Sequence, residues 1–507
     1  MANVRLLPGI PAPFVLAIAL LGSAGCIPPA PPDFTNSGGA GHGSGGGPNS
    51  GGRVGSASGG AGTASGGAGL PAGSGGSSTS GSGGGAGSGG STGSSGGRPG
   101  SGGTASGGAP SRGPTPATAA AKFPFPQNRE QSRCIYPTLY RNEDVVAAYE
   151  QWKADTVTTD GAKIGDNQYR RVKRTMEPGL EAGSTVSEGI AYGMMIAVYM
   201  GDQALFDDLW KYEQSFLDRN GLMDWYINAA GTERLGSGAA TDADEDMAFA
   251  LLMADKQWGG MGSLTKTYLQ TAKEQITKIW NHEVYDYKHL KPGDTWGDGG
   301  TINISYFAPY YYRLFAKVDT ANTANWNNLL EQSYATLAKA LNATNGNENN
   351  GLVPAWCDAD GKPNPGVFVT GAPTHYQYDS CRTPFRIGMD WCLFGEVRAK
   401  DYVTKTSTFF SSAGGVAAIV DGYDLNGTPR PEFQKGVMSS IQSAAFVGPA
   451  GVGAMAMPAS THQTFVNQAF AALSTNKLLV GGTYYDLSWT VISMLMMTGN
   501  FIDLTMY

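Results

Sequence analysis

Apolar residues recur at helical spacing in about twelve stretches between residues 143 and 499. A recurrence every three to four residues puts these side chains on one face of a helix, whereas a strand would alternate every second residue. Long alternating stretches are scarce, and the segments between the apolar stretches contain Gly, Pro, Asp and Asn, which favour loops. The pattern predicts an all-α domain with helices near 143–153, 187–200, 203–218, 245–257, 263–281, 305–317, 325–341, 384–399, 402–413, 432–444, 461–474 and 484–499.

This number of helices in one large domain suits a closed ring of helical hairpins. In such a ring the inner helices surround a central cavity, and the loops at one end form a cleft. A solenoid of stacked helix pairs would contain a similar number of helices, but solenoids carry a sequence repeat of fixed period, and the chain has no such repeat. We therefore favour the closed ring.

The first 25 residues have the pattern of an export signal. Arg5 precedes an apolar stretch over residues 14–21, and small residues follow up to Cys26. The apolar stretch is too short for a comfortable membrane span. A cysteine after small residues resembles the lipobox of bacterial lipoproteins, although Ser23 stands where that motif usually has leucine. We expect an exported protein, either tethered to the cell envelope by lipid on Cys26 or secreted after ordinary cleavage with an incidental Cys26.

Residues 26–121 form a Gly/Ser-rich segment with almost no aromatic or charged residues. Such a segment cannot bury enough apolar surface to offset the entropy lost on ordering, so we expect a disordered linker. A flexible chain of roughly 85 residues has an end-to-end distance of about 50 Å. The linker would hold the remaining part, residues 122–507, away from an envelope surface, and that part has the size of one large domain.

Charge and cysteine content narrow the function further. A net charge of −7 argues against nucleic-acid and anionic-lipid binding. The five histidines are scattered and no CxxC pair occurs, so we expect neither a metal centre nor a cofactor. In an exported protein Cys134, Cys357, Cys381 and Cys392 predict one or two disulfides, with three possible pairings. We expect a monomer.

Three alternating carboxylates, Asp242, Asp244 and Asp246, stand at the start of one apolar helical stretch. The free backbone N–H groups and the dipole of a first helical turn stabilise negative charge, so we expect these acids to stay ionised. An EF-hand calcium loop is excluded by spacing. It needs glycine at its sixth position and glutamate at its twelfth, where this chain has Met247 and Met253.

A second acidic centre is Glu188, which stands alone in an apolar helical stretch. Desolvation raises the pKa of a carboxyl group, as a general acid near neutral pH requires. An alternative interpretation is a capping box, because Thr185 and Glu188 have the S/T-x-x-E spacing. On spacing alone the capping box is the favoured interpretation.

A third centre is Asp379, which lies beside Tyr378 and three residues before Arg382, just ahead of a helix that begins with proline. A carboxylate held by an arginine stays ionised and can accept a proton from water, while the tyrosine orients that water. The alternative is a structural Asp/Arg pair at a helix N-terminus.

Several aromatic residues lie in segments rich in Gly, Asp and Asn rather than within helices, namely Trp225, Trp296, Trp356 and Tyr306. Aromatic rings stack on the apolar faces of sugars, and Asp and Asn bind hydroxyl groups. Each ring taken singly is better explained as a core residue. Together with carboxylates in unequal environments, the set indicates a polysaccharide ligand.

The segment 240–258 resembles the signature of glycoside hydrolase family 8, A-[ST]-D-[AG]-D-x-x-[IM]-A, at every position. The segments around Glu188 and over 296–306, 378–386 and 484–489 resemble the same family in the same order. The resemblance extends over nearly all of residues 123–507. It implies an (α/α)6 barrel and an inverting, endo-acting hydrolase of β-1,4-linked glycans.

Residue by residue, the resemblance also implies roles. Glu188 matches the proton donor and Asp379 the general base, while Asp242 matches the acid that holds the sugar at the cleavage point. Arg382 and Tyr306 match residues that orient the base and its water. An inverting mechanism requires the acid and the base to lie roughly 6.5 to 9.5 Å apart.

Other positions bear on substrate contacts. Trp225 and Trp296 match residues that stack on sugar rings, and Asp244 and Tyr378 are further candidates for substrate binding. Phe385 replaces a tryptophan often found in this family. We expect an endo-β-1,4-glucanase, with chitosanase, xylanase and mixed-linkage glucanase as alternatives, and a non-catalytic surface glycan-binding protein as the alternative of another class.

Overall fold

The computed structural model describes residues 120–175, 181–364, 374–430, 442–475, 478 and 483–507. The expected export signal, Cys26 and all of the expected linker except residues 120 and 121 lie outside these residues. Within the described part of the chain, no helix has the length and apolar character needed to cross a membrane.

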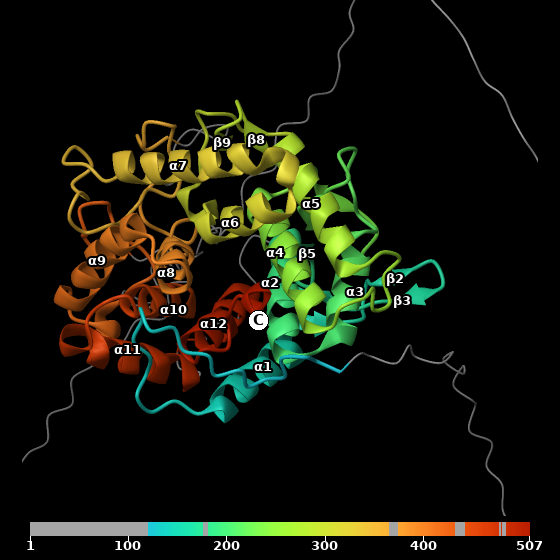
Figure 1. Cartoon of the computed structure of the whole chain (residues 1–507), viewed down its shortest axis with the longest axis horizontal. Helices are drawn as coiled ribbons and strands as arrows, with labels where there is room; N and C mark the ends of the chain where they lie inside the picture. The colour runs from blue at the N-terminus through green and yellow to red at the C-terminus, as the bar shows by residue number, and fades with distance from the viewer. Residues whose placement is uncertain (1–119, 176–180, 365–373, 431–441, 476–477, 479–482) are drawn as a thin grey trace, which may run out of the picture. The chain divides into compact units, whose positions relative to one another are not determined.

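Twelve α-helices form the described part of the domain, and they alternate between an inner and an outer position (Figure 1). Even-numbered helices lie inside, and each odd-numbered helix packs outside a neighbouring even-numbered one. The helices are α1 (Asn142–Thr156), α2 (Ser187–Met200), α3 (Gln203–Glu213), α4 (Thr241–Gln257), α5 (Tyr268–Glu283), α6 (Pro309–Val318), α7 (Thr323–Ala340), α8 (Thr383–Leu393), α9 (Val397–Ser412), α10 (Ala444–Ala454), α11 (Ala459–Ser474) and α12 (Tyr484–Met497). The predicted all-α ring of helical hairpins, an (α/α)6 barrel, is confirmed.

Short strands and 3-10 helices occupy the connections. The strands are β1 (Val157–Thr158), β2 (Lys163–Ile164), β3 (Asn167–Gln168), β4 (Arg171–Val172), β5 (Thr185–Val186), β6 (Tyr226–Ile227), β7 (Arg234–Gly236), β8 (Val284–Tyr285) and β9 (His289–Leu290). The 3-10 helices are η1 (Ile304–Tyr306), η2 (Thr320–Asn322), η3 (Val416–Ala418) and η4 (Leu504–Met506). The antiparallel sheet β5-β6-β7 brings Val186 opposite Tyr226, next to the start of α2.

One predicted helix lies mostly outside the described residues, and another was given too long a range. The stretch 432–444 lies mostly outside the described residues, and the helix in this region is α10, which begins at Ala444. Ala, Gly and Val around Pro449 make this helix apolar on all sides, so no alternation of apolar and polar residues marks it in the sequence. The predicted helix 384–399 also extends too far. The chain leaves α8 after Leu393, and Gly395 adopts a φ of 93°, which is outside the helical range.

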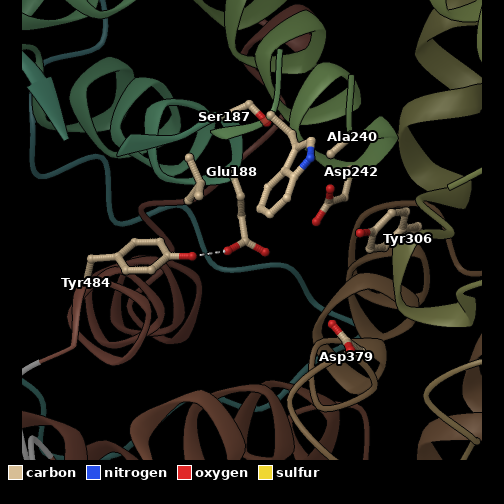
Figure 2. Close-up of a pocket in the computed structure, with 9 residues that line it drawn as sticks. Ser187, Glu188, Ala240, Asp242, Tyr306, Asp379 and Tyr484 are labelled. Atoms are coloured by element: carbon tan, nitrogen blue, oxygen red, sulfur yellow. Dashed lines mark hydrogen bonds between the residues drawn. The ribbon is translucent and has the colours of Figure 1, made fainter. Parts of the chain in front are cut away.

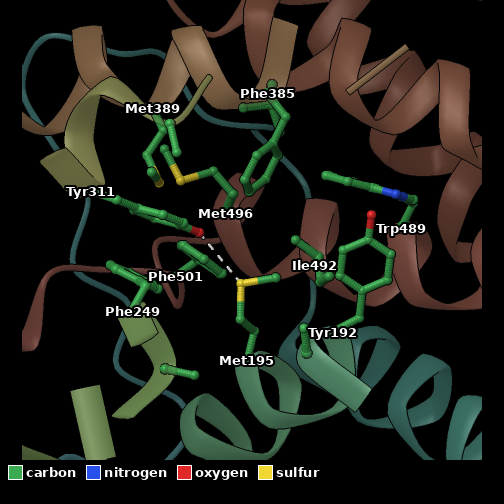
Figure 3. Packing of buried hydrophobic residues seen from close by; sticks show 14 of the residues in the cluster. Tyr192, Met195, Phe249, Tyr311, Phe385, Met389, Trp489, Ile492, Met496 and Phe501 are labelled. Atoms are coloured by element: carbon green, nitrogen blue, oxygen red, sulfur yellow. Dashed lines mark hydrogen bonds between the residues drawn. The ribbon is translucent and has the colours of Figure 1, made fainter. Parts of the chain in front are cut away.

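Large side chains fill the interior of the ring (Figure 3). Phe249 of α4 stacks on Tyr311 of α6 with ring centroids 4.1 Å apart, which joins these two inner helices. Phe385 of α8 meets Trp489 of α12 edge to face at 5.2 Å. The expected central cavity is therefore wrong for this part of the interior, because a closely packed core occupies it.

One disulfide joins Cys134, in the segment before α1, to Cys392 near the end of α8. Cys357 and Cys381 are buried free thiols. Of the pairings that the sequence left open, the structure contains one bond, and it ties the N-terminal segment to an inner helix.

Candidate active site

One pocket lies at the end of the barrel where the inner helices α2, α4 and α12 begin (Figure 2). The space within it that water can enter is about 30 Å³. Three carboxylates reach it from separate segments, the first turn of α2, the first turn of α4 and the loop before α8. Its lining residues are Val186, Ser187, Glu188, Trp225, Ala240, Asp242, Tyr306, Asp379 and Tyr484.

Glu188 lies in the first turn of α2, with its side chain 14 % exposed. Its Oε1 accepts a hydrogen bond from the Tyr484 hydroxyl at 2.6 Å, and its Oε2 accepts one from Arg382 Nη1 at 2.6 Å. Burial raises the pKa of Glu188 to about 8, although the charge of Arg382 and the Tyr484 hydrogen bond both lower it. The raised pKa favours the protonated form of this carboxyl group near neutral pH.

The capping-box interpretation of Glu188 is wrong. The residue before α2 is Val186, and no side chain caps this helix. The Thr185 hydroxyl instead donates to the carbonyl oxygen of Val172 at 2.9 Å, because Thr185 lies in β5 beside β4. Glu188 is thus free of a capping role and directed into the pocket (Figure 2).

Arg382 joins two of the carboxylates. Its Nη1 donates to Asp242 Oδ2 at 2.5 Å as well as to Glu188, while its Nε donates to the Ser305 hydroxyl at 3.1 Å. Arg382 was expected to hold Asp379, but among the described residues it acts on that carboxyl through its charge and not through a hydrogen bond, since the side chain extends from the start of α8 towards α2 and α4. Asp242 Oδ1 is buried and has no hydrogen-bond partner among the described residues, so it can accept from a ligand hydroxyl.

Asp379 lies in the loop before α8. Its Oδ2 accepts hydrogen bonds from Gln377 Nε2 at 3.1 Å and Trp356 Nε1 at 3.3 Å. Burial raises the pKa of Asp379, while the nearby charge of Arg382 and these two donors lower it. The pKa is raised overall because burial outweighs the charge of Arg382 and the two donors, which runs against the expectation that arginine keeps this carboxyl ionised.

The other two acids of the cluster on α4 lie outside the pocket. Positions two apart on a helix differ by about 200° in direction, so alternating residues cannot share one face. Asp244 accepts from Gln275 Nε2 of α5 at 2.7 Å, and burial raises its pKa well above the ordinary value. Asp246 pairs with Arg386 of α8 through two bonds of 2.6 and 2.8 Å. Asp244 was expected to contact substrate and to stay ionised, but it is not among the residues that line this pocket, and its raised pKa disfavours the ionised form.

The predicted aromatic residues divide into two groups. Trp225 and Tyr306 line the pocket, the first from the chain before β6 and the second from η1. Trp296 is not among the lining residues, and its Nε1 donates to the carbonyl oxygen of Ala239 at 3.1 Å. Tyr378 also lies outside the lining, and its hydroxyl donates to Asp421 at 3.0 Å.

Sequence reasoning missed Tyr484, Gln377 and Ser305. Tyr484 is the first residue of α12, and Glu188 lies in the first turn of α2. Both residues therefore stand at the start of an inner helix, and this shared position is the signal that would have indicated Tyr484. Gln377 and Ser305 act through bonds to Asp379, and the Ser305 hydroxyl donates to the Asp379 carbonyl oxygen at 2.6 Å. The contact of Ser305 joins segments 74 positions apart, which no periodicity or spacing signals, whereas Gln377 lies two positions before Asp379 in the same loop.

Comparison with known proteins identifies the family. The family model described as glycosyl hydrolases family 8 matches residues 123–499. The chain belongs to this family. It is 36% identical to Endoglucanase 2 of Ruminiclostridium josui over 399 residues, which cover 77% of this chain and 80% of that protein. It is also 36% identical to Endoglucanase A of Acetivibrio thermocellus over 359 residues, 70% of this chain and 69% of that protein.

The fold agrees with a solved structure of the same kind. The apo structure of a β-1,3-1,4-glucanase from Paenibacillus sp. X4 matches with a TM-score of 0.66 and 30% identity, and the match covers 75% of this chain and 99% of that chain. The protein is therefore a glycosidase with the (α/α)6 barrel that the sequence predicted.

Proposed function

We propose that the protein is an inverting endo-β-1,4-glucanase in which Glu188 is the general acid and Asp379 the general base. The observation that carries the proposal is that these two carboxyls reach one pocket in unlike environments. Glu188 has a pKa raised to about 8 and starts the reaction protonated, whereas Asp379 receives two neutral hydrogen bonds that favour its ionised form. Relatives named endoglucanases support the choice of β-1,4-glucan.

The proposed reaction is a single displacement. Glu188 donates its proton to the glycosidic oxygen as that bond breaks, and Asp379 takes a proton from the water that attacks the anomeric carbon on the opposite face. Room for this water requires the two carboxyls to lie roughly 6.5 to 9.5 Å apart. Asp242 Oδ1, which has no hydrogen-bond partner among the described residues, accepts a hydroxyl of the sugar at the cleavage point.

Product analysis tests the substrate and the mode of attack. Purified protein is incubated with carboxymethylcellulose, xylan, chitosan and barley glucan, and the released oligosaccharides are separated. We expect a rapid fall in viscosity of carboxymethylcellulose, and NMR of the first products should show the α-anomer, as inversion demands. Activity confined to xylan, chitosan or barley glucan would refute the cellulase assignment, and a β-anomeric first product would refute inversion.

Mixed-linkage β-glucan is the second candidate substrate. The structural relative from Paenibacillus sp. X4 is named a β-1,3-1,4-glucanase, and it matches over 99% of its length. A preference for barley glucan over carboxymethylcellulose in the same assay would favour this activity. Binding of oligosaccharides without release of reducing ends, unchanged by Glu188→Gln, would instead favour a non-catalytic glycan-binding protein.

We propose further that the enzyme is exported as a monomer and tethered to the cell envelope by lipid on Cys26. The support is the apolar stretch at residues 14–21, followed by small residues and Cys26, ahead of the Gly/Ser-rich linker. Labelled palmitate should be incorporated by the full-length chain and not by Cys26→Ala. Secretion of unlabelled wild-type protein into the medium would refute the tether.

A further inference from the structure

The two carboxylate oxygens of Asp379 lie in different surroundings. Oδ2 accepts both hydrogen bonds that the carboxyl receives within the described residues, one from Gln377 and one from Trp356. Oδ1 accepts no hydrogen bond from the described residues and is not fully buried, and the Asp379 side chain lines the pocket. Figure 2 shows the Asp379 side chain at the pocket wall across from Glu188.

Gln377 holds Asp379 at two points. Its Oε1 accepts the backbone N–H of Asp379 at 2.8 Å, and its Nε2 donates to Oδ2 at 3.1 Å. One amide group therefore binds the main chain and the carboxyl of the same residue. The backbone N–H of Gln377 donates in turn to the Ser380 hydroxyl at 2.7 Å, so the loop itself is fixed. This closed set of bonds restricts rotation of the carboxyl.

Trp356 supplies the second donor from a rigid position. Its indole is 3 % exposed, and its ring packs beside Trp296 and Tyr306 with centroids 6.3 and 6.2 Å away. A ring held between two other aromatic residues has little freedom, so the direction of its Nε1–H is fixed. The donor reaches Asp379 Oδ2 at 3.3 Å.

We propose that Gln377 and Trp356 are positioning residues that occupy Oδ2 of Asp379 and so reserve Oδ1 as the atom that accepts the proton from the attacking water. This inference rests on the proposed role of Asp379 as the general base. Both donors are neutral, so they favour the ionised carboxyl without adding a charge that a neutral glucan would have to displace. They also keep water away from Oδ2, which leaves one acceptor aimed at the pocket.

The test is the pH profile of kcat/KM for Trp356→Phe and Gln377→Glu. Phenylalanine keeps the packed ring but lacks the N–H, and glutamate keeps the shape but adds a second carboxyl that must share a proton with Asp379. We expect the acidic limb to move upward by about one pH unit in each variant, with kcat reduced more than KM is changed. The alkaline limb, which reports Glu188, should stay in place.

Trp391→Phe is the matched control, because its indole N–H donates to the carbonyl oxygen of Arg133 at 3.1 Å, away from the pocket. It should leave the acidic limb unmoved. An unmoved acidic limb in both Trp356→Phe and Gln377→Glu would overturn the inference.

Asp379→Asn, measured in parallel, separates this inference from the proposed function. If Asp379→Asn retains turnover, the assignment of the base fails and this inference fails with it. If Asp379→Asn is inactive while the acidic limb stays unmoved in Trp356→Phe and Gln377→Glu, only the positioning role fails. A crystal structure of Glu188→Gln with a cello-oligosaccharide gives a direct reading. A water bound to Oδ1 supports the inference, and a water bound to Oδ2 overturns it.

Discussion

Tyr484 donates a hydrogen bond of 2.6 Å to Oε1 of Glu188 and so joins the first turn of α12 to the first turn of α2. The two residues are 296 positions apart in the sequence. A phenol that donates to a carboxylate stabilises its ionised form, so Tyr484 opposes the burial that raises the pKa of Glu188 to about 8. The acid is thereby kept from becoming so weak that proton transfer is disfavoured.

Replacing Tyr484 with phenylalanine should raise the pKa of Glu188. The alkaline limb of kcat should then move to higher pH, by about one unit, because the ionised carboxyl loses one donor. Rates across pH 6 to 11 on a soluble glucan measure the shift. Tyr485→Phe is the control, since that hydroxyl donates to the carbonyl oxygen of Tyr378 at 3.1 Å. A downward shift for Tyr484→Phe would contradict the donor role.

The wild-type pH profile should be bell-shaped. Glu188 must be protonated, so activity should fall as pH rises through about 8. Asp379 must be ionised, and since burial raises its pKa, activity should fall on the acidic side at a pH above the ordinary value for aspartate. Initial rates at saturating substrate measure both limbs. An alkaline limb near pH 5 would show that Glu188 is not the acid.

Glu188→Gln should lower kcat on carboxymethylcellulose by about 10²- to 10⁴-fold, the range for loss of a general acid. Binding of cello-oligosaccharides should persist, because glutamine keeps the size of the side chain and can still accept from Arg382. Calorimetry with a cello-oligosaccharide measures the binding. Glu143→Gln, on the exposed side of α1, is the control and should keep full activity. Equal kcat values for both variants would show that Glu188 is not the general acid.

Local patterns predicted most of the helices. The roles proposed for Glu188 and Asp379 came from the family resemblance, because spacing alone favoured a capping box at Glu188 and allowed a structural Asp/Arg pair at Asp379. The buried face of a helix is recognisable from apolar residues that recur every three to four positions. An isolated glutamate in an apolar stretch indicates a buried carboxyl group. Glu188 fits this indication, as its raised pKa follows from burial. Contacts between distant segments were not predictable, because the direction of Arg382 towards α2 and α4 depends on how the ring closes.

The cluster on α4 illustrates the same limit. The position at a first helical turn predicted ionised acids, but burial outweighs the helix dipole at Asp244, where the surroundings include Glu283. A dipole effect of about 0.3–1 kcal/mol is small beside the desolvation of a buried charge. The sequence shows which residues start a helix, whereas only the packed structure shows which of them face α5 and which face the pocket.

Asp244→Asn should change how stability depends on pH. The pKa of Asp244 is raised in the folded state, so its contribution to stability is full below about pH 3.8 and is lost as pH rises through the folded value. Asparagine cannot ionise and can still accept from Gln275, so the variant should gain stability over wild type as pH rises. Urea unfolding at pH 5, 7 and 9 measures this difference. Asp166→Asn, in an exposed turn, is the control, and its free energy of unfolding should depend on pH as that of wild type does. A difference that shrinks with rising pH would contradict the raised pKa of Asp244.

The disulfide between Cys134 and Cys392 should contribute about 2 to 5 kcal/mol to the free energy of unfolding. It links residues 258 positions apart, so it restricts most of the unfolded domain as well as fixing the N-terminal segment against α8. The double variant Cys134→Ala/Cys392→Ala should unfold at lower urea concentration than wild type, and reductant should lower the wild-type midpoint towards that of the variant. Because Cys357 and Cys381 are free thiols, reductant should not change the midpoint of the double variant itself. A further fall in that midpoint would indicate a second bond between Cys357 and Cys381, which the structure contradicts.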